Sequence, residues 1–368
     1  MVHKSRRKTI MKRIIALFKK THEKKEEPAY PLALSNTYKV TKKTLGVGSF
    51  AIVKECVHRS TGLPFALKII LKKAIADILK QVRHPHIVSM HDLYESKDAV
   101  YIVTDLASGG ELFQQLLNKG SYTEKDASNL TKQMLEGLQY LHARDIVHRD
   151  MKPENLLFQT PAENANLMIT DFGLSKILKG RDDILTTACG TPGYVAPEVL
   201  RQTGHNKPVD LWSVGVILYT LLSGYTPFWG EDQASLFESI MSGKYQYDEE
   251  YWHDISDSVF LLTRQINVAK NLIDRLLTLD PDKRITAEEA LQHPWITNSN
   301  KDENGPRTST NLAPTVRKGY SSRNSFTTAT LLNHRLNKKN NGSDVEEEDE
   351  HSLTTSAPSS NQEDEESR

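Results

Sequence analysis

The sequence is poor in cysteine and has no long apolar run. Its two cysteines, Cys56 and Cys189, stand far apart and form no CxxC pair, which argues against a disulfide framework or a zinc site and favours a reducing compartment. The longest apolar run near the N-terminus, residues 14–18, is too short for a signal-peptide core or a membrane-spanning helix. Residue 2 is Val, so the N-myristoylation pattern is absent. We therefore expect a cytoplasmic protein, with the nucleus as a second location.

The chain also lacks a net charge, because 47 Lys and Arg balance 47 Asp and Glu among 368 residues. Hydrophobic residues make up 38% and charged residues 26%, a soluble globular composition with no overall bias toward nucleic acid or membrane. The charge is unevenly placed, since residues 1–25 contain ten Lys and Arg and a single acid. Apolar residues recur there at helical spacing, at Ile10, Ile14, Leu17 and Phe18. We interpret residues 1–37 as a solvated basic arm, and favour this over an anionic-membrane contact or an autoregulatory role.

The apolar pattern changes from strand-like to helical along the chain. Strands are expected at residues 40–41, 52–57, 65–70, 87–93 and 100–105, with a short helical stripe at 75–82. Helices are expected at residues 111–117, 123–142, 209–222 and 269–279. This order predicts a small β-rich lobe followed by a larger helical lobe. Past Ile296 the composition shifts to Asn, Ser, Thr, Lys and Glu, which predicts disorder outside one segment discussed below.

A glycine-rich turn, residues 46–51, lies between the first two strand patterns. Such a turn lets backbone N–H groups approach phosphates, although the pattern alone is more often an ordinary hairpin turn. Lys68 ends the next apolar stretch. A lysine there usually only reaches solvent, but after such a hairpin it stands where phosphate chemistry needs a cation.

The strongest signal is the stretch from His148 to Asn155, which puts a carboxylate, an ammonium and an amide within eight residues. Phosphoryl transfer depends on positioning and charge neutralisation rather than on covalent help. Asp150 can orient a substrate hydroxyl and accept its proton, and Lys152 can neutralise the transferred phosphoryl oxygens. Asn155 and Asp171, the latter just before Phe-Gly, offer oxygen ligands suited to Mg²⁺.

The glycine-rich turn, Lys68, the stretch 148–155 and Asp171-Phe-Gly follow one another in the order of the signature set of eukaryotic protein kinases, which they resemble. Residues 196–198, residues 210–215 and Arg284 match further family motifs, and the resemblance implies that Arg284 pairs with Glu198. It covers residues 38–296 and implies an α+β, two-lobed kinase fold, with an N-lobe at 38–106 and a C-lobe at 107–296. Lys152 together with residues 190–194 resembles Ser/Thr rather than Tyr kinases.

The resemblance implies ATP and Mg²⁺ as cofactors and a defined nucleotide site. Asp105–Ala107 would be the hinge that grips adenine, Thr104 would guard the pocket behind it, and Lys68 would hold the α- and β-phosphates. The implied nucleotide contacts are Leu45, Gly46, Val47, Gly48, Ser49, Phe50, Ala51, Ile52, Val53, Lys68, Asp105, Ala107, Glu111, Glu154, Asn155 and Asp171.

Within the family, residues 108–113, 186–194 and 291–296 resemble the calcium/calmodulin-dependent branch, in its type I form. By this resemblance Thr187 is the site at which an upstream kinase activates the enzyme, since a phosphate there would pair with Arg149 and order the loop. Glu111 and Glu154 resemble acidic positions that select a basic residue in protein substrates. Each is equally explained as a solvated surface charge.

Two features depart from the family pattern. Kinases pair the strand lysine with a glutamate on the following helix, yet no Glu lies between Lys68 and His84, and Ile75 stands in its place. Asp77 is a poor substitute, because it is shorter and lies off the apolar stripe. The apolar stretch 259–268 is inserted, and would extend a helix or form a sticky surface. Mis-assigned exons would explain both features. Because the glutamate partner of Lys68 is missing, a catalytically weak pseudokinase or scaffold is the alternative to an active kinase.

The tail, residues 297–368, contains a candidate regulatory segment at 311–337. No acid lies between Glu303 and Asp344, and basic residues alternate with the bulky apolar residues Val316, Tyr320, Phe326, Leu332 and Leu336. Calmodulin's acidic, Met-lined groove accepts such a helix, although Gly and Ser residues weaken it and a solvated basic tail is the alternative. We expect the free segment to cover the cleft and Ca²⁺-calmodulin to lift it away.

Overall fold

The computed structural model describes most of the chain between residues 30 and 321. The described residues are 30–47, 51–70, 82–96, 99–178, 184–186, 189–253, 255, 259–261, 264–266, 268–298 and 310–321. For residues 47, 70, 259–261 and 264–266 it describes the backbone alone. The predicted basic arm (apart from its last eight residues), the helical stripe at 75–81 and the tail beyond residue 321 lie outside this set, as does the whole of a second unit, residues 328–368.

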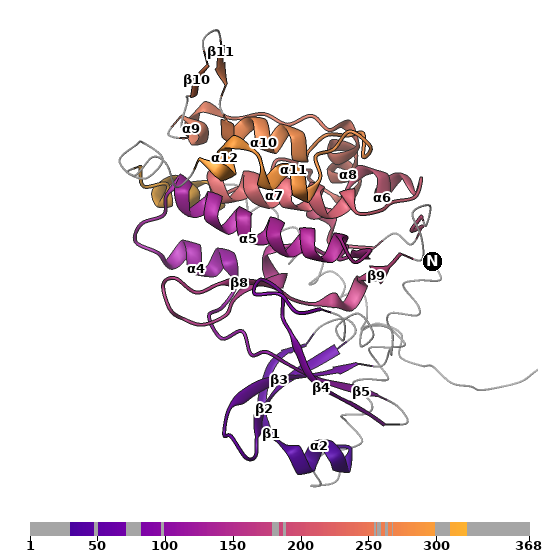
Figure 1. The fold of residues 1–368 in the computed structure, drawn as a ribbon. Helices are drawn as coiled ribbons and strands as arrows, with labels where there is room; N and C mark the ends of the chain where they lie inside the picture. Colours follow the sequence, from indigo (N-terminus) through magenta and orange to yellow (C-terminus); the bar gives the residue numbers. More distant parts are fainter. Residues whose placement is uncertain are drawn as a thin grey trace, which may run out of the picture. The chain divides into compact units, whose positions relative to one another are not determined.

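The N-terminal part is a five-stranded antiparallel sheet in the order β1-β2-β3-β5-β4 (Figure 1). Its strands are β1 (Tyr38–Val47), β2 (Ala51–His58), β3 (Pro64–Ile70), β4 (Met90–Glu95) and β5 (Val100–Thr104). The predicted strands are confirmed, except that the fourth begins at Met90 because Ile87 forms an isolated bridge with His84. A short helix, α2 (Leu32–Thr37), buries Leu34 against one face of the sheet. Lys68 lies in the central strand, opposite Val53 and Ile102, so its backbone is fixed on both sides.

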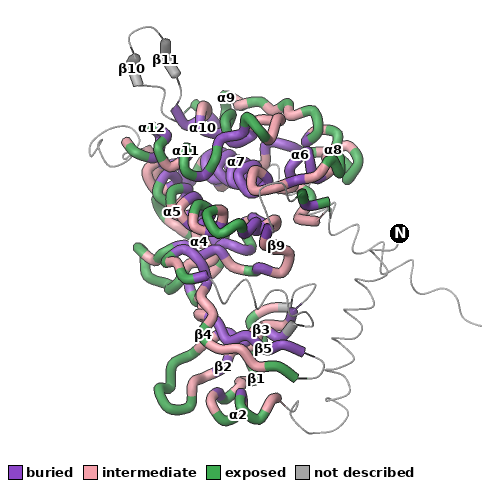
Figure 2. The backbone as a smooth tube through the Cα atoms, turned by 45° about the vertical axis from the view of Figure 1, so that its right-hand side comes forward, coloured by how far each residue is buried: buried purple, intermediate pink, exposed green. Residues whose placement is uncertain are grey.

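The C-terminal part is helical and is built around α7 (Pro208–Ser223). Nearly every residue of α7 is buried, and Figure 2 shows it buried along its length. A helix that is apolar on all sides can be stable only in the interior, and α5 (Glu124–His142), α9 (Glu249–Trp252) and α10 (Val268–Leu276) pack directly against it. The other helices of this part are α4 (Leu112–Asn118), α6 (Pro197–Arg201), α8 (Gln233–Ser242), α11 (Ala287–Leu291) and α12 (Pro294–Thr297). The four predicted helices are confirmed as α4, α5, α7 and α10. Among the described helices, none combines the length and apolarity that a membrane span requires.

Short strand pairs and 3-10 turns hold the two motif-bearing loops in place. One pair joins β6 (Ile146–Val147) to β9 (Lys176–Ile177), and the other joins β7 (Leu156–Phe158) to β8 (Leu167–Ile169). The turns are η1 (Pro153–Asn155), η2 (Phe172–Leu174) and η3 (Pro192–Tyr194). The first loop therefore runs from β6 to η1, and the second from β8 to η2.

The insertion at 259–268 forms a hairpin, so the expectation that it extends a helix is wrong. Its strands are β10 (Val259–Leu261) and β11 (Arg264–Ile266), paired antiparallel beside α9 and α10 (Figure 1). The following helix begins only at Val268. β-branched and aromatic residues favour strands, which accounts for the local preference of Val259, Phe260 and Ile266.

A segment of the tail, residues 310–321, packs on the helical part. Residues 313–321 are helical (gold in Figure 1), and Leu312, Ala313 and Val316 are fully buried in the same core as α5 and α7. This part of the predicted regulatory segment is thus ordered and docked.

A buried ion pair links α6 to the loop before α11. Arg284 donates to both carboxylate oxygens of Glu198, at 2.7 and 3.0 Å, as the sequence predicts. Neither side chain is more than 5% exposed. Arg284 also donates to the carbonyl oxygens of Thr278 and Pro208, so its charge is well partnered.

Replacing Arg284 by Met should destabilise the fold, because it leaves the Glu198 carboxylate buried without a counter-ion. We expect the free energy of unfolding to fall by about 3–5 kcal/mol, measured by denaturant titration. The matched control is Lys283→Met, which removes an exposed pair with Asp280 and should have little effect. Equal effects of the two substitutions would contradict a structural role for the buried pair.

Candidate active site

The loop from β6 to η1 is anchored by Asp210, near the start of α7. One carboxylate oxygen of Asp210 accepts from the His148 backbone N–H at 2.9 Å, and the other accepts from that of Arg149 at 2.8 Å. The His142 ring nitrogen lies 2.8 Å from the first oxygen. Burial alone would raise the pKa of Asp210, but the hydrogen bond and charge of His142 outweigh it and hold this pKa below its usual value. Arg149 has φ 67°, a left-handed conformation that these bonds maintain.

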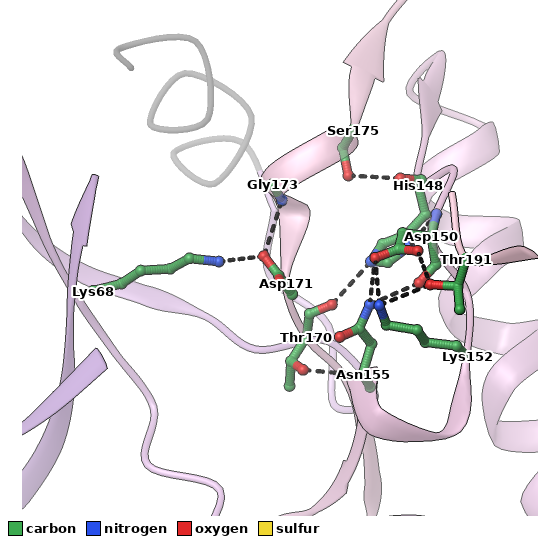
Figure 3. A network of polar contacts seen from close by, with 10 residues as sticks. All are labelled: Lys68, His148, Asp150, Lys152, Asn155, Thr170, Asp171, Gly173, Ser175 and Thr191. Carbon is green, nitrogen blue, oxygen red and sulfur yellow. Dashed lines mark hydrogen bonds and ion pairs between the residues drawn. The ribbon is translucent and has the colours of Figure 1, made fainter. Parts of the chain in front are cut away.

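Three polar side chains hold the Asp150 carboxylate (Figure 3). Thr191 donates its hydroxyl to one oxygen at 3.0 Å, and Lys152 reaches the other at 3.0 Å. Asn155 donates to that second oxygen at 3.2 Å and to the Asp150 carbonyl oxygen at 2.7 Å. Lys152 also donates to the Thr191 hydroxyl at 2.9 Å, which closes the network. Asp150, Lys152 and Asn155 are thus brought together as predicted.

Thr191 is a site residue that the motif analysis missed. It stands in the 190–194 stretch, which was used only to distinguish Ser/Thr from Tyr kinases. The sequence shows a hydroxyl residue at position 191, but it does not show that this loop meets the loop that contains Asp150.

Asp171 follows β8 and begins the turn η2. Its φ of 56° places it in the left-handed region, and one carboxylate oxygen accepts from the Gly173 N–H at 3.1 Å. The same oxygen forms an ion pair with the Lys68 ammonium (Figure 3). Burial alone would raise the pKa of Asp171, but the adjacent charge of Lys68 outweighs it and keeps this pKa below its usual value.

Lys68 therefore has a counter-ion even though the family glutamate is missing from the sequence. Its side chain is only 13% exposed, so its ammonium needs a nearby negative charge. Among the residues that the structure describes, the one ion pair of Lys68 is with Asp171. Ile75 and Asp77, on which the sequence argument turned, lie outside the described residues.

Asn155 and Asp171 fit a Mg²⁺ site in the chemistry of their oxygens. The Asn155 amide nitrogen faces Asp150, and Figure 3 shows its oxygen turned to the side on which Asp171 lies. Only one Asp171 oxygen takes the contacts with Lys68 and Gly173. No cluster of three or more His, Cys, Asp or Glu residues suited to a metal occurs within the described ranges. Two oxygen ligands match Mg²⁺, which keeps waters and takes substrate phosphates as further ligands.

Most of the predicted nucleotide contacts come from the sheet and from the segment that follows it. Leu45 and Gly46 end β1, whereas Ala51, Ile52 and Val53 begin β2. Asp105 and Ala107 follow β5, and the Asp105 carboxylate accepts from the Ser89 N–H at 2.8 Å. Of the glycine-rich turn, Val47 is described by its backbone alone, and Gly48, Ser49 and Phe50 lie outside the described residues.

Glu111 and Glu154 interact electrostatically. The pKa of Glu111 is raised by burial and by the like charge of Glu154. Two carboxylates so placed form an acidic surface that a basic side chain would neutralise.

Arg149 carries an unpaired donor at the candidate phosphate position. Its Nε donates to the Leu174 carbonyl oxygen at 2.6 Å, whereas its buried Nη1 has no hydrogen-bond partner in the described part of the chain. Thr187, the predicted phosphosite, lies outside the described residues.

A double-mutant cycle tests the Lys68–Asp171 pair. Because the two groups touch, the effects of Lys68→Met and Asp171→Asn on the free energy of unfolding should not add, with a coupling of roughly 0.5–1 kcal/mol given the half-exposed Asp171. Denaturant unfolding without nucleotide measures it, and the same cycle at the exposed Lys43–Glu55 pair is the control. Additive effects at Lys68 and Asp171 would show that Lys68 is held by another partner.

The chain is similar to known protein kinases over most of its length. The protein kinase domain model matches residues 39–296. The chain is 43% identical to calcium/calmodulin-dependent protein kinase cmkB of Emericella nidulans, over 77% of this chain and 71% of that protein. It is 44% identical to a type 1 calcium/calmodulin-dependent kinase of Macrobrachium nipponense (76% and 80% covered) and 46% identical to type 1B of Rattus norvegicus (72% and 76%). The chain is therefore a protein Ser/Thr kinase that belongs to the calcium/calmodulin-dependent kinase family.

Proposed function

We propose that Asp150 orients the hydroxyl of a protein Ser or Thr and accepts its proton as the γ-phosphoryl of ATP is transferred. The observation that carries this assignment is the network on its carboxylate, which Thr191, Lys152 and Asn155 hold from two separate loops. For the general base of phosphoryl transfer, a fixed position matters more than high basicity, because this reaction depends mainly on positioning.

Two lysines and two oxygen ligands would each neutralise or bind a different part of the charged nucleotide. Lys152, already within 3.0 Å of Asp150, would neutralise the transferred phosphoryl oxygens. Lys68 would hold the α- and β-phosphates from the central strand of the sheet. Asn155 and Asp171 would hold Mg²⁺, which when bound neutralises phosphate charge.

The pseudokinase alternative gains no support from the comparisons, since the three relatives described above are named as kinases. A weak enzyme is expected if Lys68, without a helix glutamate, has no carboxylate to hold it in position. The Asp171 carboxylate restrains Lys68, which removes the main reason for expecting a weak enzyme.

We infer that the substrates carry basic residues near the target hydroxyl. Glu111 and Glu154 are both exposed and would supply the acidic surface that binds them; burial and, after it, the like charge of Glu154 raise the pKa of Glu111. Phosphorylation of Thr187 by an upstream kinase would supply the anion that the buried Nη1 of Arg149 lacks.

We further propose that the tail inhibits the enzyme and that Ca²⁺-calmodulin relieves the inhibition. Tyr320, near the end of the docked helix, lies close enough to Tyr194 to raise its pKa, after the larger effects of burial and of Glu154. Leu312 and Val316 are buried, so calmodulin cannot reach them while the helix is docked. Its first contacts would be with residues beyond 321, where Phe326, Leu332 and Leu336 provide apolar anchors.

Phosphate transfer from labelled ATP to a basic Ser/Thr peptide tests both proposals. With Ca²⁺-calmodulin the full chain should be at least about 100-fold faster than Asp150→Asn, the usual scale of general-base catalysis, and removal of Ca²⁺ should lower its rate. A wild-type rate equal to that of Asp150→Asn would refute the residue roles. Equal rates with and without Ca²⁺-calmodulin would refute the regulation alone.

A further inference from the structure

The described part of the tail, residues 310–321, begins with contacts to the loop between α4 and α5. Asn311 accepts from the Tyr122 backbone N–H at 3.0 Å and donates to the Gly120 carbonyl oxygen at 3.2 Å. The Leu312 N–H then donates to the Tyr122 carbonyl oxygen at 2.6 Å. These bonds fix the point at which the tail helix begins, while Leu312 and Ala313 are buried beside them.

Two basic residues hold the middle of the helix. Arg317 donates to the Leu117 carbonyl oxygen at 3.0 Å and also to that of Lys119, at the C-terminus of α4. Carbonyl groups there lack helical partners and carry partial negative charge, so a guanidinium is a suitable cap. Lys318 pairs with Glu250 at 2.8 Å, but this pair is exposed and contributes little.

The helix then crosses the end of α7 at two glycines. Gly224 ends α7 with φ 86°, and a Cβ on it would overlap the Val316 carbonyl oxygen and lie 2.8 Å from the carbonyl carbon. On the tail side, a Cβ on Gly319 would overlap the Ser223 carbonyl oxygen and lie 3.3 Å from the Gly224 Cα. Both obstacles are backbone atoms, which cannot rotate aside as a flexible side chain would. The two backbones therefore touch because neither residue has a side chain.

We propose that Gly319 is the latch of the resting enzyme: its missing side chain allows helix 313–321 to dock on the end of α7 and so sets how firmly the tail is held. The regulatory consequence rests on the proposed inhibition by the tail, whereas the docking itself does not. Glycine is a poor helix former, so Gly319 weakens the isolated helix and strengthens only its docked form. The segment is thereby suited to fold on the kinase and to loosen once it is lifted away.

Gly319→Ala in the full chain separates the helix propensity of the residue from its close contact with α7. Alanine is the better helix former, so a helix that did not need the glycine contact would be protected more strongly, not less. We expect backbone hydrogen exchange across residues 311–321 to become at least about tenfold faster, because the added methyl group separates the two backbones. Gly319→Leu, another good helix former with a larger side chain, should accelerate exchange further.

Ser321→Ala is the matched control, since Ser321 is exposed on the same helix and alanine raises helix propensity there too. Its exchange should equal that of the wild type or be slower. Unchanged or slower exchange in Gly319→Ala would contradict the claim that the tail helix docks because Gly319 has no side chain.

Peptide phosphorylation without Ca²⁺ provides the second readout, and the rate should rise several-fold in Gly319→Ala toward the Ca²⁺-calmodulin rate of the wild type. Faster exchange with no rise in the phosphorylation rate would agree with the role of Gly319 in docking and would refute inhibition by the tail. If exchange stays slow while the activity rises, the latch is refuted, because activation then arises without undocking.

Discussion

The active site depends on one buried carboxylate, that of Asp210. It accepts two consecutive backbone N–H groups of the catalytic loop and is itself held by His142. These bonds maintain the left-handed conformation of Arg149, and the loop can then present Asp150 to Thr191, Lys152 and Asn155. Because α7 is buried on all sides, the carboxylate sits on a rigid element. The other end of α7, at Gly224, supports the tail helix, so one helix carries both the catalytic loop and its proposed restraint.

The second constraint is the pair between Lys68 and Asp171, which joins the sheet to the loop after β8. In a kinase with the usual glutamate, the lysine and the metal-binding aspartate have separate partners. Here, among the residues that the structure describes, the Asp171 carboxylate pairs with the lysine. The proposed Mg²⁺ would therefore share this carboxylate with Lys68.

The sequence was enough to identify residues that the structure brings together around Asp150, but it showed few of the long-range contacts. Asp150, Asn155 and Asp171 were identifiable because phosphoryl transfer requires those groups at short spacing, and the Arg284–Glu198 pair followed from the family resemblance. Thr191 and His142 were missed because their roles depend on partners 41 and 68 residues away. The sequence places Val316 among the apolar anchors of a calmodulin-binding segment, but its burial against the helical part could not be predicted, since periodicity shows that a face is apolar but not which surface covers it. The inserted stretch was ambiguous for the same reason, because short apolar runs suit helix and strand equally.

The kinetics of Asp210→Asn test most directly the claim that this carboxylate positions the catalytic loop. With one acceptor charge lost, the loop should shift, and a displacement near 1 Å lowers kcat by about 100-fold. The KM for ATP should change little, since the sheet that contributes most nucleotide contacts is untouched. Asp145→Asn, at the exposed pair with Lys207 near the same helix end, is the control and should retain kcat. A kcat for Asp210→Asn equal to that of Asp145→Asn would contradict the account.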